Sequence, residues 1–245
     1  MLAIIGGSGL TQLANLNVVR REVVRTPYGE PSGALTFGRL CEQPVVFLAR
    51  HGYGHTIPPH QVNYQANLWA LKGARAEVII SVASVGGIRA DLCPGTLVVP
   101  DQIIDYTWGR KSTFHEGLDE PVVHIDFTEP YDAAVRRRIL AAGAAAGEKV
   151  FDGAVYAATQ GPRLETAAEI NRLARDGADV VGMTGMPEAA LARELGIPYA
   201  AINVVANYAA GRADSSQRIC FDSIETVLHE AMGRVRKVLE HLCTV

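Results

Sequence analysis

Short runs of apolar residues alternate along the chain with segments in which apolar positions recur at helical spacing. Several of these runs are apolar at consecutive positions, which is typical of central strands covered by helices on both faces. The pattern predicts strands at 2–5, 45–49, 78–83, 96–100, 154–159, 179–182 and 199–206. It predicts helices at 61–72, 133–146, 166–175, 188–194 and 223–242.

This alternation of strands and helices indicates an α/β fold built around one sheet. No low-complexity linker or internal repeat interrupts it, so we expect a single domain spanning residues 1–245. Ligands of such sheets bind at the ends of strands, where loops begin. Candidate functional residues are therefore sought immediately after the predicted strands.

Composition narrows the class of protein. With 48% hydrophobic and 20% charged residues, a chain of 245 residues can bury a core without a metal or a disulfide. A net charge of −3 without a basic tail argues against nucleic acid as a partner. The four cysteines form no CxxC pair, which favours the cytoplasm. Neither a signal peptide nor a membrane partner is expected.

Two motifs suggest an anion site. Gly6-Gly7-Ser8-Gly9 follows the first predicted strand, where glycines allow backbone N–H groups to approach an anion and Ser8 adds a hydroxyl. A tight turn without a ligand is the alternative. Arg50 and His51 directly follow the second predicted strand, and His55 comes four residues after His51. The planar fork of an arginine suits phosphate oxygens. The histidine spacing also suits a metal, but no carboxylate lies nearby in sequence, so no metal is expected.

The remaining motifs also follow predicted strands. Ser84 belongs to a stretch of small residues that ends in Gly86-Gly87, and Met183-Thr184 follows the strand at 179–182. Glu165 lies at a predicted helix start, where it caps the helix or accepts from a ligand. Asn207 ends the last strand and has both a donor and an acceptor, although a turn role is equally open. Met183, taken alone, is more often a core residue.

In this order the motifs resemble the trimeric purine nucleoside phosphorylase superfamily, and its methylthioadenosine phosphorylase type in particular. The resemblance rests on 6–10, 50–52, 55–57, 62–67, 161–163 and 183–188, and it covers nearly the whole chain. It implies a mixed, twisted and partly barrel-like sheet flanked by helices, as in purine and uridine phosphorylases. It also implies a homotrimer with shared active sites. The implied reaction is reversible phosphorolysis in purine salvage, with inorganic phosphate as co-substrate and no cofactor.

The resemblance also implies roles for single residues. The phosphate ligands would be Ser8, Arg50, His51, Ala83, Ser84 and Thr184. Met183 would pack under the sugar, and Phe221 and Ile224 would surround a 5′-methylthio group. His124 would reach the 5′ pocket of a neighbouring subunit.

One departure from the adenine-specific members bears on the base. They carry Asp-x-Asp where this chain has Asn207-Tyr208-Ala209. The 6-oxopurine phosphorylases instead combine an Asn at the strand end with a Glu in a Gly-Pro-x-x-Glu-Thr motif, matched here by Glu165. The resemblance therefore implies that Glu165 and Asn207 form a catalytic, base-binding pair, with Ala209 beside them. A 6-oxopurine pocket on a methylthioadenosine-type body is similar to that of methylthioinosine phosphorylases. A general inosine/guanosine phosphorylase and a methylthioadenosine phosphorylase are the alternatives.

Overall fold

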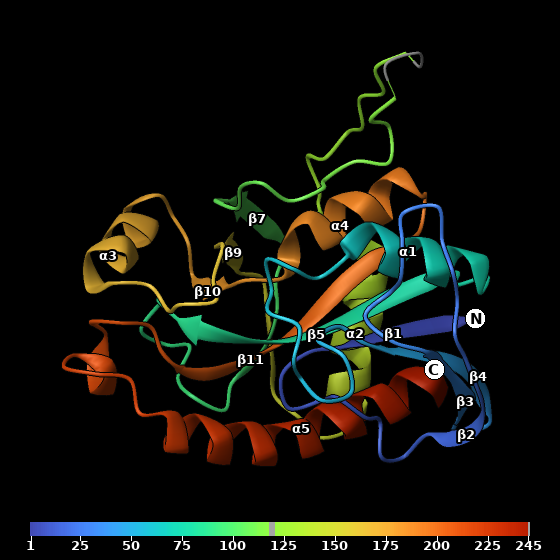
Figure 1. Cartoon of the computed structure of the whole chain (residues 1–245). Coiled ribbons are helices and arrows are strands. Elements are labelled where there is room, and N and C mark those ends of the chain that lie inside the picture. Colours follow the sequence, from blue (N-terminus) through green and yellow to red (C-terminus); the bar gives the residue numbers. More distant parts are fainter. Residues whose placement is uncertain (118–120, 245) are drawn as a thin grey trace.

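The computed structural model describes residues 1–117 and 121–244. One mixed sheet forms the centre, and helices cover both of its faces (Figure 1). The strands are β1 (Leu2–Gly6), β2 (Asn17–Glu22), β3 (Leu35–Leu40), β4 (Gln43–Ala49), β5 (Val78–Gly87), β6 (Leu97–Val99), β7 (Gln102–Asp105), β8 (Val150–Asp152), β9 (Val155–Ala158), β10 (Val180–Gly182) and β11 (Tyr199–Tyr208). The helices are α1 (Tyr64–Gly73), α2 (Ala133–Ala145), α3 (Ala167–Arg175), α4 (Gly185–Glu194) and α5 (Phe221–Thr244), with a short 3₁₀ turn at Ala213–Ser215.

The sheet branches at β5. One path runs β2-β3-β4-β1-β5-β10-β9-β7, and a second leaves β5 through β11 to β6 and β8. β5 pairs in parallel with β11 along nearly its whole length, and it pairs in parallel with β1 at its start and antiparallel with β10 at its end. A strand that changes partners along its length bends the sheet toward a barrel. The expected α/β fold with a mixed, twisted sheet is therefore confirmed.

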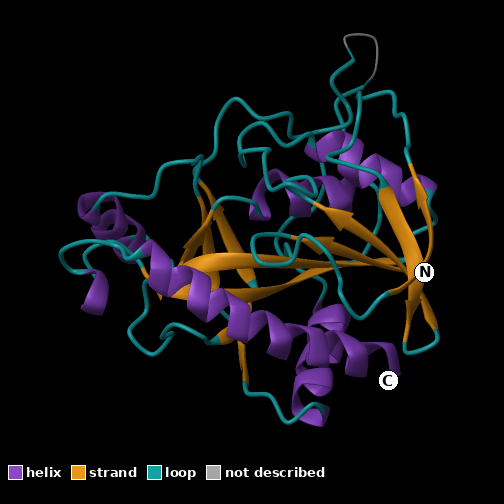
Figure 2. Ribbon diagram, turned by 60° about the horizontal axis from the view of Figure 1, so that its bottom comes forward, coloured by secondary structure: helices purple, strands orange, loops and turns teal. Residues whose placement is uncertain are grey.

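Consecutive apolar residues in the central strands enter two different cores. Ile5 and Ile79 belong to the core under α1 and α4, whereas Ile4 and Ile80 belong to the core over α2 and α5. Neighbouring side chains of a strand point to opposite faces, so a strand covered on both faces is apolar at most of its positions. Figure 2 shows the long helix α5 lying along one face of the sheet.

Each strand and helix predicted from the pattern is present, with ends shifted by a few residues. Thr166 begins α3 with a capping box: its hydroxyl accepts from the Glu169 N–H, and the Glu169 carboxylate accepts from the Thr166 N–H. Four strands were not predicted, namely β2, β3, β7 and β8. All six residues of β2 are exposed at the sheet edge, so it has no alternating apolar face to detect.

Within the described ranges 1–117 and 121–244, no helix is both long enough and apolar enough to span a membrane.

Candidate active site

A cavity of about 510 Å³ opens where the carboxyl ends of the central strands meet, within the usual size range of small-molecule sites. β1 lies between β4 and β5 and runs parallel to both, so their ends converge. The cavity brings together twelve of the residues expected from the sequence: Ser8, Arg50, His51, Ala83, Ser84, Glu165, Met183, Thr184, Asn207, Ala209, Phe221 and Ile224. These residues come from segments up to 216 positions apart, since Ser8 and Ile224 mark the two extremes.

The glycine loop after β1 is packed tightly against its neighbours. A Cβ atom at Gly7 would lie 2.6 Å from the Val82 carbonyl oxygen and 2.7 Å from Nη1 of Arg50. Any larger residue would push the loop away from these two neighbours. Gly7 is therefore required for close approach, and it holds the adjacent Ser8 at the cavity wall.

Arg50 is fully buried, and most of its donors are already used. Its Nε and Nη2 atoms form a two-point contact with the carboxylate of Glu188, at 2.6 and 2.9 Å. Nη2 also donates to Ser81 Oγ, and Nη1 donates to the Val82 carbonyl. A guanidinium has five N–H hydrogens, and these contacts use four of them. One hydrogen on Nη1 therefore remains for a ligand. Glu188 thus occupies the planar fork that the sequence assigns to phosphate oxygens.

The electrostatics of this pair keep Arg50 charged. Burial by itself lowers the pKa of Arg50, but the attraction and hydrogen bonds of Glu188 outweigh it and raise the pKa above its ordinary value. Glu188 Oε1 also accepts from Ser81 and from Tyr199. A buried, hydrogen-bonded ion pair of this kind has little net charge to offer a ligand.

The two histidines of the loop after β4 differ in environment. His51 is buried, and its Nδ1 lies 2.8 Å from the Ile57 carbonyl. Burial and the Arg50 charge lower the pKa of His51 to about 4, so the ring is neutral at pH 7. Because a carbonyl only accepts, Nδ1 carries the hydrogen and Nε2 is an acceptor. His55 is exposed, and its Nε2 lies 3.4 Å from Ser8 Oγ.

Thr184 and Met183 are held at the start of α4. The Tyr156 hydroxyl accepts from the backbone N–H groups of Thr184 and Gly185. The Thr184 side chain makes no capping hydrogen bond, and Thr184 lines the cavity. Gly161, at φ +61°, lies directly against the Met183 sulfur, and a Cβ atom there would overlap it. The geometry of this corner thus depends on Gly161.

Arg110 organises the same corner and was missed from the sequence. Its guanidinium donates to the carbonyls of Met183, Met186 and Gln160, at 2.8, 2.6 and 2.9 Å. It therefore ties the loop after β9 to the start of α4. Its position in the chain, 73 residues before Met183, gave no sequence signal for this role.

Glu165 and Asn207 lie in the part of the cavity bordered by β10 and β11. Glu165 Oε1 accepts from the Thr159 hydroxyl at 2.6 Å, and Thr166 caps α3, so Glu165 does not serve as the cap. The Asn207 amide nitrogen donates to the Tyr208 carbonyl at 2.6 Å. The ladder of β11 with β5 shifts between Val205 and Asn207, and this bulge lets the consecutive residues Ala206 and Asn207 both line the cavity.

The lining that α5 and the segment before it contribute to the cavity is apolar. Phe221 and Ile224 lie in the first turn of α5, and Ile219 and Leu228 extend the same surface. Phe221 is 68% exposed in the isolated chain, so the cavity is open on this side. Sequence reasoning did not single out Ile219 and Leu228, because their signal is only apolar character at helical spacing.

His124 is the one expected site residue that the cavity of a single chain does not include. It is exposed, in a segment without regular structure before α2. Its expected role concerns a neighbouring subunit, and it stays a prediction.

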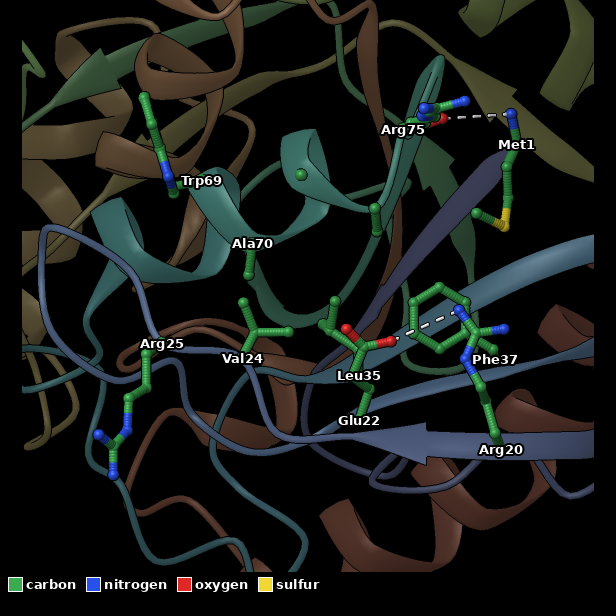
Figure 3. A pocket seen from close by; sticks show the side chains of 12 residues that line it. Met1, Arg20, Glu22, Val24, Arg25, Leu35, Phe37, Trp69, Ala70 and Arg75 are labelled. Carbon is green, nitrogen blue, oxygen red and sulfur yellow. Dashed lines mark hydrogen bonds and ion pairs between the residues drawn. The ribbon is translucent and has the colours of Figure 1, made fainter.

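A second hollow, of about 420 Å³, lies between α1, β2 and β3 (Figure 3). Arg20, which pairs with Glu22 and stacks over Phe37, lines it together with Arg25 and Arg75. It contains none of the expected site residues. In the part of the chain that the structure describes, no group of three or more His, Cys, Asp or Glu side chains is placed to hold a metal ion.

Comparisons with known proteins identify the family of this chain. The family model of the phosphorylase superfamily matches residues 1–244, and the chain belongs to this superfamily. It is 54% identical over 237 residues to a probable S-methyl-5′-thioinosine phosphorylase of Pseudomonas syringae, covering 97% of this chain and 96% of the relative. It is 47% identical over 215 residues to the 6-oxopurine nucleoside phosphorylase of Pyrococcus furiosus, and the match covers 86% of this chain and 80% of the relative.

The solved structures include a methylthioadenosine phosphorylase from Schistosoma mansoni in complex with adenine. It superposes with a TM-score of 0.93 at 32% identity, over 99% of this chain and 90% of that chain. The expected superfamily is therefore confirmed.

Proposed function

We propose that this protein cleaves S-methyl-5′-thioinosine with inorganic phosphate, giving hypoxanthine and 5-methylthioribose 1-phosphate. The observation that carries the proposal is that Glu165, Asn207 and Ala209 line one cavity together with Ser8 and Thr184. Two similar proteins bear the names S-methyl-5′-thioinosine phosphorylase and 6-oxopurine nucleoside phosphorylase, which supports the same reading.

Phosphate is the nucleophile in this proposal, and no cofactor takes part. One phosphate oxygen forms a bond to the anomeric carbon while the bond from that carbon to the purine nitrogen breaks. The bonding electrons leave with the base, which takes up a proton. The hydroxyls of Ser8, Ser84 and Thr184 are the donors facing the oxyanion, with Ala83 contributing its backbone. A transition state with positive charge on the sugar is then stabilised by the phosphate itself.

Base selection follows from hydrogen-bond complementarity. Hypoxanthine offers an N1–H donor and an O6 acceptor, and the free Oε2 of Glu165 is a suitable acceptor for N1–H. The Asn207 amide donates to O6 or the N7 region after it turns away from the Tyr208 carbonyl. Adenine lacks the N1–H donor and would leave the carboxylate unpaired. Such mismatches cost a factor of about 10⁴ in specificity at buried sites.

The preference for a 5′-methylthio group rests on the apolar end of the cavity. Phe221, Ile224 and Leu228 offer no partner for a hydroxyl at this end. Burial of each additional CH₂ group contributes about 0.8 kcal/mol. A methylthio group therefore gains binding free energy at this end, whereas a hydroxyl group would lose its hydrogen bonds to water there without replacement.

A homotrimer with shared active sites is part of the proposal. Phe221 leaves one side of the cavity open, and the exposed Val122 and Val123 adjoin His124. A neighbouring subunit that covers these side chains would close the 5′ end. Light scattering after size-exclusion chromatography measures the mass of the assembly, and a monomer at catalytic concentrations would contradict this part.

The decisive experiment is a panel of four nucleosides, each with and without phosphate. We expect the highest kcat/KM with methylthioinosine, and no cleavage without phosphate. Faster turnover of methylthioadenosine would replace the proposal with a methylthioadenosine phosphorylase. Equal use of inosine would indicate a general inosine/guanosine phosphorylase. Cleavage that needs no phosphate would indicate a hydrolase.

The base pocket has its own test. The double variant Asn207→Asp/Ala209→Asp restores the acidic pair of adenine-specific members and should shift preference toward methylthioadenosine. Ala209→Ser adds a small polar group without a charge and is the matched control. An unchanged preference in the double variant would refute the assignment of Asn207.

A further inference from the structure

The positive charge available to an anion in the cavity is smaller than its residues suggest. Four of the described side chains that line it are titratable: Arg50, His51, His55 and Glu165. Glu165 is acidic and lies at the base end. The charge for a phosphate dianion must therefore come from Arg50 or from one of the two histidines.

Arg50 contributes little net charge because Glu188 forms a two-point contact with it. Both side chains are 0% exposed, so water does not separate them. One Nη1 hydrogen remains for a ligand, as described above. A dianion near this pair meets the guanidinium and, just behind it, a carboxylate of opposite charge.

His51 does not supply the missing charge at neutral pH. With a pKa lowered to about 4 by burial and by Arg50, its ring is neutral. Its Nδ1 hydrogen is directed at the Ile57 carbonyl, so Nε2 presents a lone pair. An acceptor binds a protonated phosphate oxygen but adds no attraction for a dianion.

His55 is the remaining basic side chain, and it lies beside the phosphate loop. Its Nε2 is 3.4 Å from the Ser8 hydroxyl, and its ring packs edge-on against His51 with 4.9 Å between the centroids. The backbone at His55 adopts φ +51°, a left-handed conformation that is uncommon for a residue with a side chain. This conformation turns the chain after Gly52 so that the imidazole lines the cavity.

We propose that His55, in its protonated form, is the mobile cation of the phosphate subsite and binds the oxyanion together with Ser8. The proposal rests on the phosphate-dependent function above and names a ligand of that same site. In the structure Nε2 of His55 lies 3.4 Å from the Ser8 hydroxyl. With an oxyanion bound, the Nε2 hydrogen and the Ser8 hydroxyl both donate to it.

The sign of the pH dependence follows. A bound dianion favours the charged form of a neighbouring histidine, so the oxyanion binds more tightly when the ring carries a proton. Affinity should fall as pH rises through the histidine range. The titratable group that packs against His55 is the neutral His51, and Arg50 and Glu188 are the charged groups that act on His51. The pKa of His51 is lowered to about 4 by burial and by the Arg50 charge, and the Arg50–Glu188 pair is fully buried, so a pH dependence of oxyanion binding that is lost in a His55 variant is assigned to His55.

Sulfate is the probe that isolates this effect. Phosphate changes its own charge near neutral pH, whereas sulfate stays a dianion. Calorimetry of sulfate binding from about pH 5.5 to about pH 8.5 brackets the ordinary histidine pKa of about 6.5. For the wild type we expect affinity to fall roughly tenfold across this range, as suits one charge pair in a partly exposed site.

His55→Asn is the test variant, because asparagine tolerates a positive φ and keeps a donor but cannot titrate. Its affinity for sulfate should change less than about twofold between about pH 5.5 and about pH 8.5. At about pH 5.5 the variant should bind sulfate about as weakly as the wild type does at about pH 8.5. Its KM for phosphate should rise severalfold while its KM for the nucleoside stays the same. His229→Asn, an exposed histidine of α5 outside the cavity lining, is the matched control and should behave as the wild type.

The outcomes separate this inference from the proposed function. An equally steep pH dependence in His55→Asn and in the wild type would overturn the role of His55. A rise in the KM for the nucleoside with unchanged sulfate binding in His55→Asn would also overturn it, because His55 would then bind the 5′ end of the nucleoside. If the wild type binds neither sulfate nor phosphate and cleaves nucleosides without phosphate, the proposed function itself fails.

Discussion

Removing one partner of the buried ion pair between Arg50 and Glu188 should destabilise the protein strongly, because the other charge is then left buried without a partner. Both side chains are 0% exposed, and four hydrogen bonds converge on Glu188. The informative changes are Glu188→Gln, Arg50→Met and the double variant. Glu188→Gln keeps an oxygen that accepts from Ser81 and Tyr199 but removes the negative charge beside the guanidinium.

Each single change leaves one buried charge without its partner. Breaking a buried pair in this way costs about 3–5 kcal/mol. For a chain of this length, 1 kcal/mol corresponds to about 2–4 °C in Tm, so each single variant should melt roughly 6–20 °C below the wild type. The double variant removes both charges, and its loss should be smaller than the sum of the single losses by at least about 2 kcal/mol.

Thermal unfolding of all four proteins at one protein concentration measures this cycle, because the Tm of an oligomer depends on concentration. Glu225→Gln, an exposed glutamate of α5, is the control and should stay within about 0.5 kcal/mol of the wild type. Single variants that melt within 2 °C of the wild type, or strictly additive losses, would refute the reasoning. The pair would then be solvated in the folded protein.

Three further predictions concern the site. Arg110→Met removes the donors that hold the Met183 carbonyl, so kcat/KM from steady-state kinetics should fall at least about tenfold. Arg110→Lys keeps a donor and should recover part of this loss. Thr159→Val removes the hydrogen bond to Glu165, so the nucleoside KM should rise about three- to tenfold at constant phosphate KM, and Thr159→Ser should retain wild-type values. The pKa of His51 is about 4 when folded, below its ordinary value of 6.5. Between these values the unfolded chain binds a proton that the native state does not, so Tm should fall with pH from about 6.5 to about 4, and less steeply in His51→Gln.

Local sequence determined much of the fold. Consecutive apolar residues such as Ile4-Ile5 and Ile79-Ile80 mark strands covered on both faces, and Thr166 followed by Glu169 marks a helix start. These signals are local because a strand face or a helix cap is set by residues within a few positions of one another. The exposed edge strand β2 lacks such a signal and was missed.

The cavity was predicted in outline for a related reason. Gly7 and Arg50 each follow a buried strand, and the parallel strands β1 and β4 bring their carboxyl ends together. The sequence therefore places the anion-binding candidates on one edge of the sheet. It also names Glu165 and Asn207 as the candidates for base recognition.

Only the tertiary structure decided how those residues are used. Glu188 lies 138 positions from Arg50 and takes the guanidinium fork, and Arg110 ties together two loops far from it in sequence. The bulge in β11 depends on its register with β5, and it brings Asn207 to the cavity beside Ala206. Burial and charge at His51 arise from the same packing. The sequence thus determined which groups reach the site. Contacts between residues far apart in the sequence determined which hydrogen-bond donors stay free, which groups are charged and where the side chains point.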